Sequence, residues 1–205
     1  MIAPLVLSFD LDDTLWPVIP VITAAEEAML KWLRERYPRA VSGHSIESMR
    51  ELRAAVAERY PQHGHDLTFL RHRSLKDLFA AAGHEESLAD AALEVFLNAR
   101  NRVDFYDDVR PSLERLSSRY RLFALSNGNA DLRRCGIADL FAGHITARAA
   151  GAAKPDARIF AQLAAAAGVE AAQVLHIGDD PLADPDHLHG TAVIAKPLGD
   201  GENEG

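Results

Sequence analysis

The stretch Leu5-Val6-Leu7-Ser8-Phe9-Asp10-Leu11-Asp12-Asp13-Thr14-Leu15-Trp16 is an apolar run that changes abruptly into carboxylates. Four of its first five residues are apolar, which predicts a strand buried on both faces of a parallel sheet. The acidic residues then follow the carboxyl end of this strand, and this is the edge of an open α/β sheet where ligands bind. The stretch therefore predicts both the class of fold and the position of a site.

The acidic residues at this strand end predict a metal site. Asp10 and Asp12 are two residues apart, so their side chains point the same way wherever the backbone stays extended. Together with Asp13 they repel one another, and a cation must neutralise them if all are to stay ionised. A donor set made only of oxygen suits Mg²⁺ better than zinc. The alternative is an acidic turn that caps a helix starting near Pro17, but a cap needs only one such residue.

The composition limits the classes of function. The chain has 205 residues, 48% of them hydrophobic, which allows one ordinary domain or a core with a smaller accessory unit. A net charge of −8 without an evident basic face argues against a nucleic-acid partner. The single cysteine, Cys135, excludes an internal disulfide and a thiolate metal site, so we expect a cytoplasmic protein. For its assembly we expect a monomer or a weak homodimer.

The beginning of the chain does not predict a membrane partner. Residues 1–4 carry no basic group, and Asp10 interrupts the apolar run that follows. We therefore expect neither a signal peptide nor a membrane span in this stretch.

The segment 17–105 predicts a helical subdomain. Helical periodicity appears over 21–37, 46–59, 67–82 and 88–103, with no strand pattern between these ranges. Ser45 or Ser42 is the candidate cap for the second helix. Before the first helix, Pro17 and Pro20 predict a stiff connector over 16–20 rather than a regular helix.

After residue 105, helices and strands alternate, which is typical of a parallel sheet with crossover helices. Apolar runs predict strands at 121–125, 145–146, 174–177 and 193–195, and the intervening pattern includes a helix over 130–141. The predicted fold is therefore α/β, a Rossmann-like parallel sheet with an inserted all-helical cap. Residues 1–16 and 106–205 form the catalytic core, residues 17–105 form the cap, and residues 199–205 form a disordered tail.

Polar residues recur at the ends of the later strands and in the loop between them. They are Ser126, Asn127 and Gly128 after the strand 121–125, Lys154 in the loop that follows, and Asp179, Asp180 and Asp184 after the strand 174–177. Each feature alone is weak, because turns, surface lysines and acidic caps are common. Their order, each next to an apolar strand or a helix, indicates one composite site.

In four motifs the chain resembles the haloacid dehalogenase superfamily, in its phosphatase branch. The matching residues are Asp10-Leu11-Asp12-Asp13-Thr14, Ser126-Asn127-Gly128, Lys154-Pro155, and Gly178-Asp179-Asp180 with Asp184. The resemblance covers nearly the whole chain, and the helical segment between the first two motifs corresponds to the α-helical cap of that superfamily. It implies a phosphomonoester hydrolase with Mg²⁺ as its cofactor.

The chemistry of phosphoryl transfer gives each motif residue a predicted role. Asp10 attacks phosphorus and forms an aspartyl-phosphate, while Asp12 protonates the leaving oxygen and later deprotonates the hydrolytic water. Lys154 and Ser126 hold the phosphate oxygens, together with backbone N–H groups near Leu11 and Asn127. Asp10, Asp12 and Asp179 hold the metal, and the resemblance implies that Asp12 does so through its backbone carbonyl. Asp180 and Asp184 orient these ligands or pair with Lys154.

The expected partner is a small phosphorylated metabolite, because the core motifs recognise only the phosphoryl group. The segments 70–74 and 126–130 are most similar to bacterial phosphatases that act on flavin mononucleotide and on the phosphorylated pyrimidine intermediate of riboflavin synthesis. Arg71 and Arg73 lie in the first of these segments. We expect them to contact an anionic substrate from the cap.

Two other classes of function stay open. Hydrolytic 2-haloacid dehalogenases share the fold and the aspartate nucleophile, but halide departure needs neither a proton donor nor a metal, so Asp12 argues against them. A catalytically impaired binding or regulatory protein is the second alternative. It is motivated by the segment 185–190, which is too short for the helix that the superfamily usually has after the position of Asp184.

Overall fold

The structure is a computed structural model, and it describes residues 4–183 and 192–195. The chain divides into two compact units. The α/β unit takes its described residues from 1–17, 104–128 and 136–205, and the helical unit consists of 18–103 and 129–135. No pattern in the sequence indicates that 129–135 groups with the helices rather than with the sheet.

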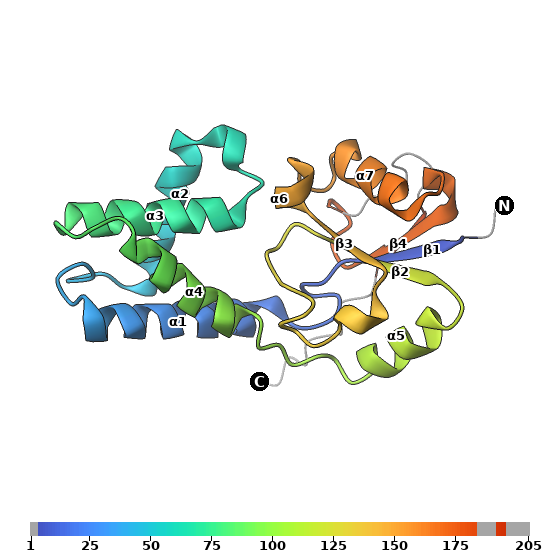
Figure 1. Ribbon diagram of the computed structural model, residues 1–205, viewed down its shortest axis with the longest axis horizontal. Helices are drawn as coiled ribbons and strands as arrows, with labels where there is room; N and C mark the ends of the chain where they lie inside the picture. The colour runs from blue at the N-terminus through green and yellow to red at the C-terminus, as the bar shows by residue number, and fades with distance from the viewer. Residues whose placement is uncertain (1–3, 184–191, 196–205) are drawn as a thin grey trace, which may run out of the picture. The chain divides into compact units, whose positions relative to one another are not determined.

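The α/β unit is built on a parallel sheet with the strand order β3-β2-β1-β4-β5 (Figure 1). The strands are β1 (Val6–Phe9), β2 (Arg121–Ser126), β3 (Gly143–Thr146), β4 (Val174–Gly178) and β5 (Ala192–Ala195). All residues of β1 are buried, as its apolar run predicts for a central strand. The predicted Rossmann-like parallel sheet is therefore confirmed.

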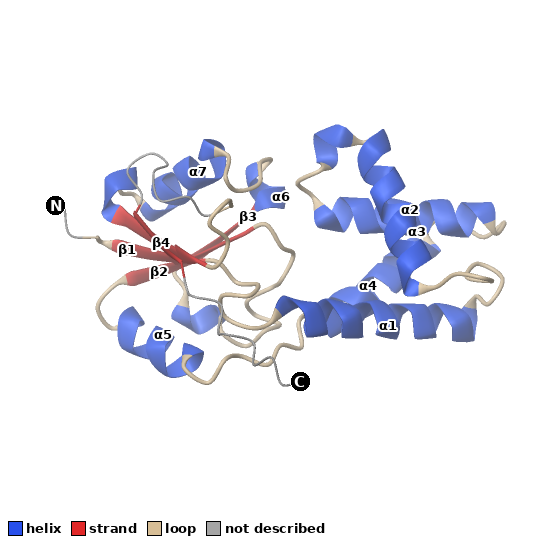
Figure 2. Cartoon of the chain, turned by 180° about the vertical axis from the view of Figure 1, so that it is seen from behind, coloured by secondary structure: helices blue, strands red, loops and turns tan. Residues whose placement is uncertain are grey.

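Helices cover both faces of this sheet. Figures 1 and 2 show α5 (Val109–Ser117) on one face and α7 (Ala157–Ala167) on the other, with the short α6 (Ala147–Ala150) beside α7. The core under α7 joins Phe123 and Leu125 of β2 to buried side chains of that helix. Short 3₁₀ helices lie at Pro61–His63, Ala138–Leu140 and Ala171–Gln173.

The helical unit contains α1 (Val18–Arg36), α2 (Ile46–Arg59), α3 (Leu67–Ala81) and α4 (Leu88–Arg100). Its core includes Leu33, Leu75, Phe79 and Phe96, which are all almost fully buried. Ser45 caps α2 by accepting a hydrogen bond from the N–H of Ser48. The helical periodicity of this segment is thus confirmed, with small differences at the helix ends.

Two expectations about helices were wrong. The first concerns Pro20, which lies inside the first turn of α1. Proline is tolerated there because the first N–H groups of a helix have no partner within the helix. The segment 16–20 is therefore not a connector, and α1 begins at Val18.

The second concerns 130–141, which forms turns and a 3₁₀ helix instead of an α-helix. The side chain of Asp131 accepts hydrogen bonds from the N–H groups of Arg133 and Arg134, and such local bonds compete with helical ones. Asn101 in turn accepts a hydrogen bond from the N–H of Asp131 at 2.6 Å. This contact ties the segment to the end of α4.

Several sequence predictions fall outside the described residues. They are the role of Asp184, the short segment 185–190 and the disordered tail 199–205. Within the part of the chain that the structure does describe, no helix is both long and apolar enough to cross a membrane.

Candidate active site

The ends of β1 and β4 place two of the predicted aspartates at the same sheet edge. The strands are parallel neighbours in which Phe9 pairs with Ile177, and the N–H of Asp10 donates to the carbonyl of Ile177 at 2.8 Å. Asp179 follows two residues after Ile177. The first and last motifs, almost 170 residues apart in sequence, therefore meet because their strands are paired.

Asp10 is held on both of its carboxylate oxygens. The N–H of Leu11 donates to Oδ1 at 2.8 Å, and the ammonium Nζ of Lys154 lies 2.9 Å from Oδ2. The second contact is an ion pair rather than a well-directed hydrogen bond. Because the Lys154 side chain is only 1% exposed, water screens this pair weakly. This arrangement suits a nucleophile that attacks an anionic group, because the positive charge of Lys154 offsets the repulsion between the Asp10 carboxylate and the anion.

Asn127 fixes the backbone that carries Lys154. Its side-chain oxygen accepts from the N–H of Lys154 at 2.7 Å, and its side-chain nitrogen donates to the carbonyl of Lys154 at 3.1 Å. Its neighbour Ser126 lies at the end of β2 and is almost fully buried. The hydroxyl oxygen of Ser126 accepts a hydrogen bond from the backbone N–H of Gly128 at 2.9 Å. The sequence assigned Asn127 a phosphate-binding N–H, and the structure adds a positioning role for its side chain.

The loop after β4 is organised by two different carboxylates. Oδ1 of Asp179 accepts a hydrogen bond from the hydroxyl of the buried Thr14 at 2.9 Å. Oδ1 of Asp180 accepts from the N–H groups of Leu182 and Ala183, so this exposed side chain shapes its own loop. Asp179 is thereby linked to the first motif, whereas these bonds give Asp180 a local structural role.

The loop that follows Asp10 closes on itself. The N–H of Asp13 donates to the carbonyl of Trp16, and that of Leu15 donates to the carbonyl of Leu11, both at 2.8 Å. Asp13 adopts a left-handed backbone with φ of 57°. The closed loop brings the indole Nε1 of Trp16 to Oδ1 of Asp12, and it donates a hydrogen bond at 2.9 Å. Sequence reasoning did not identify Trp16, although it directly follows the acidic motif.

Tyr106 is a second residue that sequence reasoning missed. Its N–H donates to the carbonyl of Leu15 at 3.1 Å, which ties it to the closed loop. Burial raises the pKa of the Tyr106 phenol, and the negative charges of Asp13 and Asp179 raise it further. The phenol therefore stays neutral beside these carboxylates. Tyr106 follows α4 and belongs to none of the sequence motifs, so the sequence did not point to it.

The oxygen donors at this sheet edge fit a small hard cation. Within the described ranges, no three side chains of His, Cys, Asp or Glu are grouped as a metal site. A cation here would take the carboxylates of Asp10 and Asp179 with the backbone carbonyl of Asp12. Mg²⁺ suits such a set, because it is usually bound by one or two carboxylates and keeps several waters.

In the helical unit, Arg71 has a structural environment. Its guanidinium lies 3.3 Å from Oε1 of Glu26 and 3.6 Å from the ring centre of Phe96. Burial, helped by the positive charge of Arg53, lowers the pKa of Arg71 to about 10, so it remains charged at neutral pH. These contacts account for Arg71 without a substrate.

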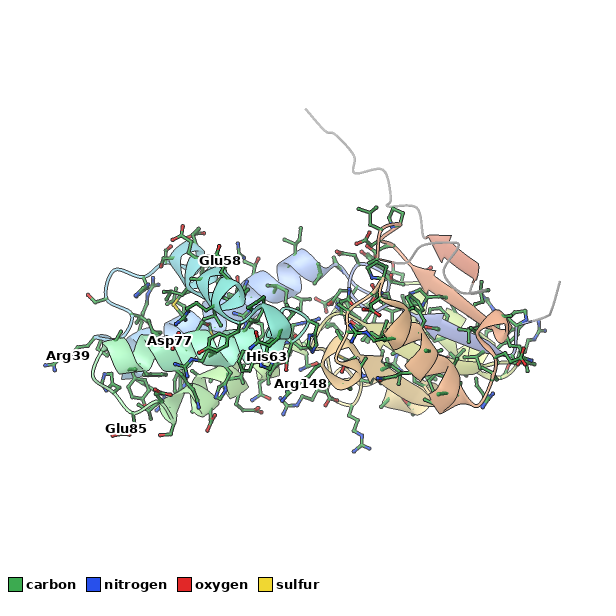
Figure 3. The ribbon with its side chains drawn as sticks, turned by 90° about the horizontal axis from the view of Figure 1, so that it is seen from above. Arg39, Glu58, His63, Asp77, Glu85 and Arg148 are labelled. Atoms are coloured by element: carbon green, nitrogen blue, oxygen red, sulfur yellow. The ribbon has the colours of Figure 1, made fainter. Side chains whose placement is uncertain are left out.

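Arg73 is also engaged within the helical unit. It lies 2.6 Å from Asp77, which Figure 3 labels on α3, and 3.9 Å from Glu86. Asp77 pairs with Arg59 of α2 as well. The geometry therefore favours a structural role for both arginines, and their contact with substrate stays a prediction without structural support.

A family model described as haloacid dehalogenase-like hydrolase matches residues 5–184. The chain is a member of this family. The match spans the motifs of the sheet edge together with the intervening helices, and it confirms the resemblance seen in the sequence. As a haloacid dehalogenase-like (HAD-like) protein, the chain is a hydrolase.

Known HAD-like proteins similar to this chain carry different names. One is the 5-amino-6-(5-phospho-D-ribitylamino)uracil phosphatase YigB of Escherichia coli strain K12, which is 34% identical over 178 residues, covering 85% of this chain and 74% of that protein. A solved structure of a 2-haloacid dehalogenase from Pseudomonas syringae pv. tomato is also 34% identical, with a TM-score of 0.89 over 100% of this chain and 92% of the other.

A third similar structure, the HAD phosphatase from Thermococcus onnurineus, has 23% identity and a TM-score of 0.64, covering 98% of this chain and 90% of the other. At that identity the likeness shows the fold alone. Because phosphatases and dehalogenases both share this HAD-like fold, the reaction must be argued from the residues of the site.

Proposed function

We propose that this protein is a Mg²⁺-dependent phosphatase that hydrolyses the phosphate ester of a small metabolite through an aspartyl-phosphate intermediate. The observation that carries the proposal is the first motif, in which a second carboxylate, Asp12, follows the candidate nucleophile Asp10 on the same loop. Departure of an alkoxide from phosphorus needs a proton, and Asp12 can supply it. Lys154, 2.9 Å from Asp10, supplies the positive charge that an incoming phosphate requires.

In the proposed first step, an oxygen of Asp10 attacks phosphorus, and the bond between phosphorus and the leaving oxygen breaks. Asp12 gives its proton to that oxygen, so the product leaves as an alcohol. In the second step, Asp12 takes a proton from water, whose oxygen attacks phosphorus and releases Asp10 and inorganic phosphate. Lys154 and Ser126 hold the phosphate oxygens in both steps, and Asn127 keeps Lys154 in place.

The proposed metal ligands are the carboxylates of Asp10 and Asp179 and the carbonyl of Asp12. When bound, Mg²⁺ supplies charge neutralisation for the phosphoryl oxygens. Thr14 orients Asp179 for this task through its hydroxyl. Tyr106 adds a neutral phenol near the carboxylates of Asp13 and Asp179, so it does not add to their negative charge.

For the substrate we propose flavin mononucleotide or a phosphorylated ribitylaminopyrimidine of riboflavin synthesis. The support is the 34% identity to YigB, whose name gives that pyrimidine phosphate as its substrate. The net charge of −8 favours a small anion bound by a few local cations over a nucleic acid. We also propose that the protein acts in the cytoplasm as a monomer or weak homodimer, without a membrane partner.

The experiment is a turnover assay with purified protein, p-nitrophenyl phosphate and a panel of phosphorylated metabolites, with Mg²⁺ and with excess chelator. We expect hydrolysis that depends on Mg²⁺, and a higher kcat/KM for the riboflavin-pathway phosphates than for sugar phosphates. Turnover that persists in chelator would contradict the metal requirement, and equal kcat/KM across the panel would contradict the substrate proposal.

A 2-haloacid dehalogenase is the second candidate, because the Pseudomonas syringae protein of that name shares 34% identity and a TM-score of 0.89 with this chain. Chloride release from 2-chloropropionate, without metal, tests it directly. Release of chloride with no phosphatase activity would replace the main proposal. Inertness in both assays would favour a binding or regulatory protein.

A further inference from the structure

Trp16 makes contacts in the α/β unit to which the proposed function gives no role. It is fully buried, and its ring meets that of Phe105 edge-on, with the centres 5.6 Å apart and the planes at 74°. Its one polar group, the indole Nε1–H, donates to Oδ1 of Asp12 at 2.9 Å. A buried indole N–H needs an acceptor, and here the acceptor is the carboxylate that the proposed function uses for proton transfer.

The backbone of the loop sets up this contact. Trp16 comes four residues after Asp12 in sequence, and the two side chains meet because the left-handed turn at Asp13, with φ of 57°, folds the chain back. The backbone N–H of Asp13 donates to the backbone carbonyl of Trp16 at 2.8 Å. Trp16 therefore closes the turn through its carbonyl and contacts Asp12 through its indole. Three contacts thus hold Trp16 in place: its ring packs against Phe105, its backbone carbonyl accepts from Asp13, and its indole N–H donates to Asp12.

We propose that Trp16 is a positioning residue that decides which oxygen of Asp12 carries the transferred proton. The inference rests on the proposed function. An indole can only donate, so Oδ1 of Asp12 has to accept. In a neutral carboxyl group the carbonyl-type oxygen is the better acceptor, which leaves the hydrogen on Oδ2. The contact also holds the Asp12 side chain in one orientation, and a fixed orientation lowers the entropic cost of proton transfer.

The proton transfer in question is the departure of the leaving group. The bond between Asp10 and phosphorus forms, the bond from phosphorus to the ester oxygen breaks, and that oxygen receives the hydrogen from Oδ2 of Asp12. The need for this hydrogen depends on the ester. An alkoxide is a poor leaving group and requires it, whereas p-nitrophenolate is a stable anion and leaves with little help.

The test is Trp16→Phe, which keeps an aromatic ring against Phe105 and removes the N–H. The measured quantity is kcat/KM for p-nitrophenyl phosphate and for an alkyl ester such as glycerol phosphate, because this constant reports the steps up to departure of the leaving group. We expect a loss of roughly tenfold or more on the alkyl ester and less than about threefold on the aryl ester. Equal losses on the two esters would overturn the inference.

Two further variants separate positioning from packing. Phe105→Leu disturbs the same ring contact but leaves the N–H in place, so its losses on the two esters should be equal. In an Asp12→Asn background, Trp16→Phe should add no further difference between the esters, because the group through which it acts is already gone. An added difference in that background would overturn the inference.

A spectroscopic measurement covers the case in which Trp16→Phe fails to fold. The chain has two tryptophans, Trp16 and Trp32, and therefore two indole N–H resonances. Trp32 lies in the helical unit beside Tyr37 and serves as the internal control. Asp12→Ala should shift the Trp16 resonance and leave that of Trp32 in place, and an unmoved Trp16 resonance would overturn the inference.

The same assays distinguish this inference from the proposed function. A wild-type protein that hydrolyses both esters, with equal losses in Trp16→Phe, would overturn only the role of Trp16. A wild-type protein without phosphatase turnover would overturn the proposed function, and the role of Trp16 with it.

Discussion

The hydroxyl of Thr14 donates a hydrogen bond to Oδ1 of Asp179 at 2.9 Å. This bond joins the loop after β1 to the loop after β4, and both loops carry candidate metal ligands. Thr14 is buried, so its hydroxyl depends on this acceptor in place of water. The orientation of Asp179 is therefore determined by the first motif as well as by its own strand.

Thr14→Val is expected to weaken metal binding while the fold is retained, because valine has the shape of threonine without the donor. Loss of a group that orients a metal ligand typically costs about 10–100-fold in metal affinity. The measurement is the Mg²⁺ concentration for half-maximal activity, together with the rise in Tm that Mg²⁺ produces. Thr14→Ser keeps the donor and should resemble the wild type, and a Val variant with unchanged Mg²⁺ dependence would exclude this role.

Asp10→Asn is expected to lower kcat by roughly 10³-fold or more, because the amide keeps the shape of the side chain but is a poor nucleophile. It should also lower Tm, since the buried ammonium of Lys154 loses its ion pair with Asp10. Kinetics and thermal unfolding of the purified variant check both effects. Asp180→Asn is the matched control, because Asp180 is exposed and bonded only within its loop in the contacts described above. Wild-type turnover in Asp10→Asn would refute the covalent mechanism.

The left-handed backbone of Asp13 predicts a difference between two substitutions. Asp13→Gly and Asp13→Ala both remove the carboxylate, but only glycine adopts a φ of 57° without steric cost. The glycine variant should be more stable than the alanine variant by about 1 kcal/mol. Chemical denaturation of both measures this difference. Equal stabilities would mean that the backbone relaxes when the side chain is shortened.

Glu26 predicts a pH dependence for the helical unit. Burial alone would raise its pKa, but hydrogen bonds from Arg50 and Arg53 and the charge of Arg71 outweigh this, and the net pKa is lowered from 4.5. A carboxyl whose pKa is lower in the folded state stabilises the protein above its unfolded pKa, and this stabilisation is lost as the pH falls through the folded value. The helical unit should therefore lose stability below about pH 4.5.

Glu26→Gln tests this dependence. At pH 7 the variant should be less stable by about 2–3 kcal/mol, a value reduced because Arg50 and Arg53 are partly exposed to water. The difference from the wild type should be smaller at pH 3 than at pH 7, because protonation of the wild-type carboxyl increases as the pH falls below 4.5. The exposed neighbour Glu27 gives the matched control, Glu27→Gln. A deficit that stays constant between the two pH values would assign the effect to packing instead of charge.

The sequence was sufficient for the sheet because the inner strands are continuous apolar runs that end in motif residues. β1, β2 and β4 appear where these runs predict them, and their order places Asp10 beside the loop of Asp179. Such features depend on local composition and on the parallel pairing of strands. Neither requires knowledge of a particular side-chain contact.

Other features could not be predicted, because they depend on residues far apart or on an unusual backbone angle. The partner of Arg71 is Glu26, 45 residues earlier, so the segment around Arg71 alone suggests a free cation. The hydrogen bond from Trp16 to Asp12 requires the positive φ of Asp13, which apolar periodicity does not reveal. The segment 130–141 has a helical sequence pattern, but the side chains of Asp131 and Asn101 accept hydrogen bonds from its backbone N–H groups and so compete with helix formation.

The grouping of 129–135 with the helices has a consequence for recombination between members of the family. The chain passes between the two units after residues 17, 103, 128 and 135, so the helical unit is not a single cassette. A chimera that exchanges only 18–103 would separate Asn129 and Asp131 from their partners Thr68 and Asn101. The unit that can be exchanged between family members therefore consists of two segments, 18–103 and 129–135, and a functional chimera must take both from the same parent.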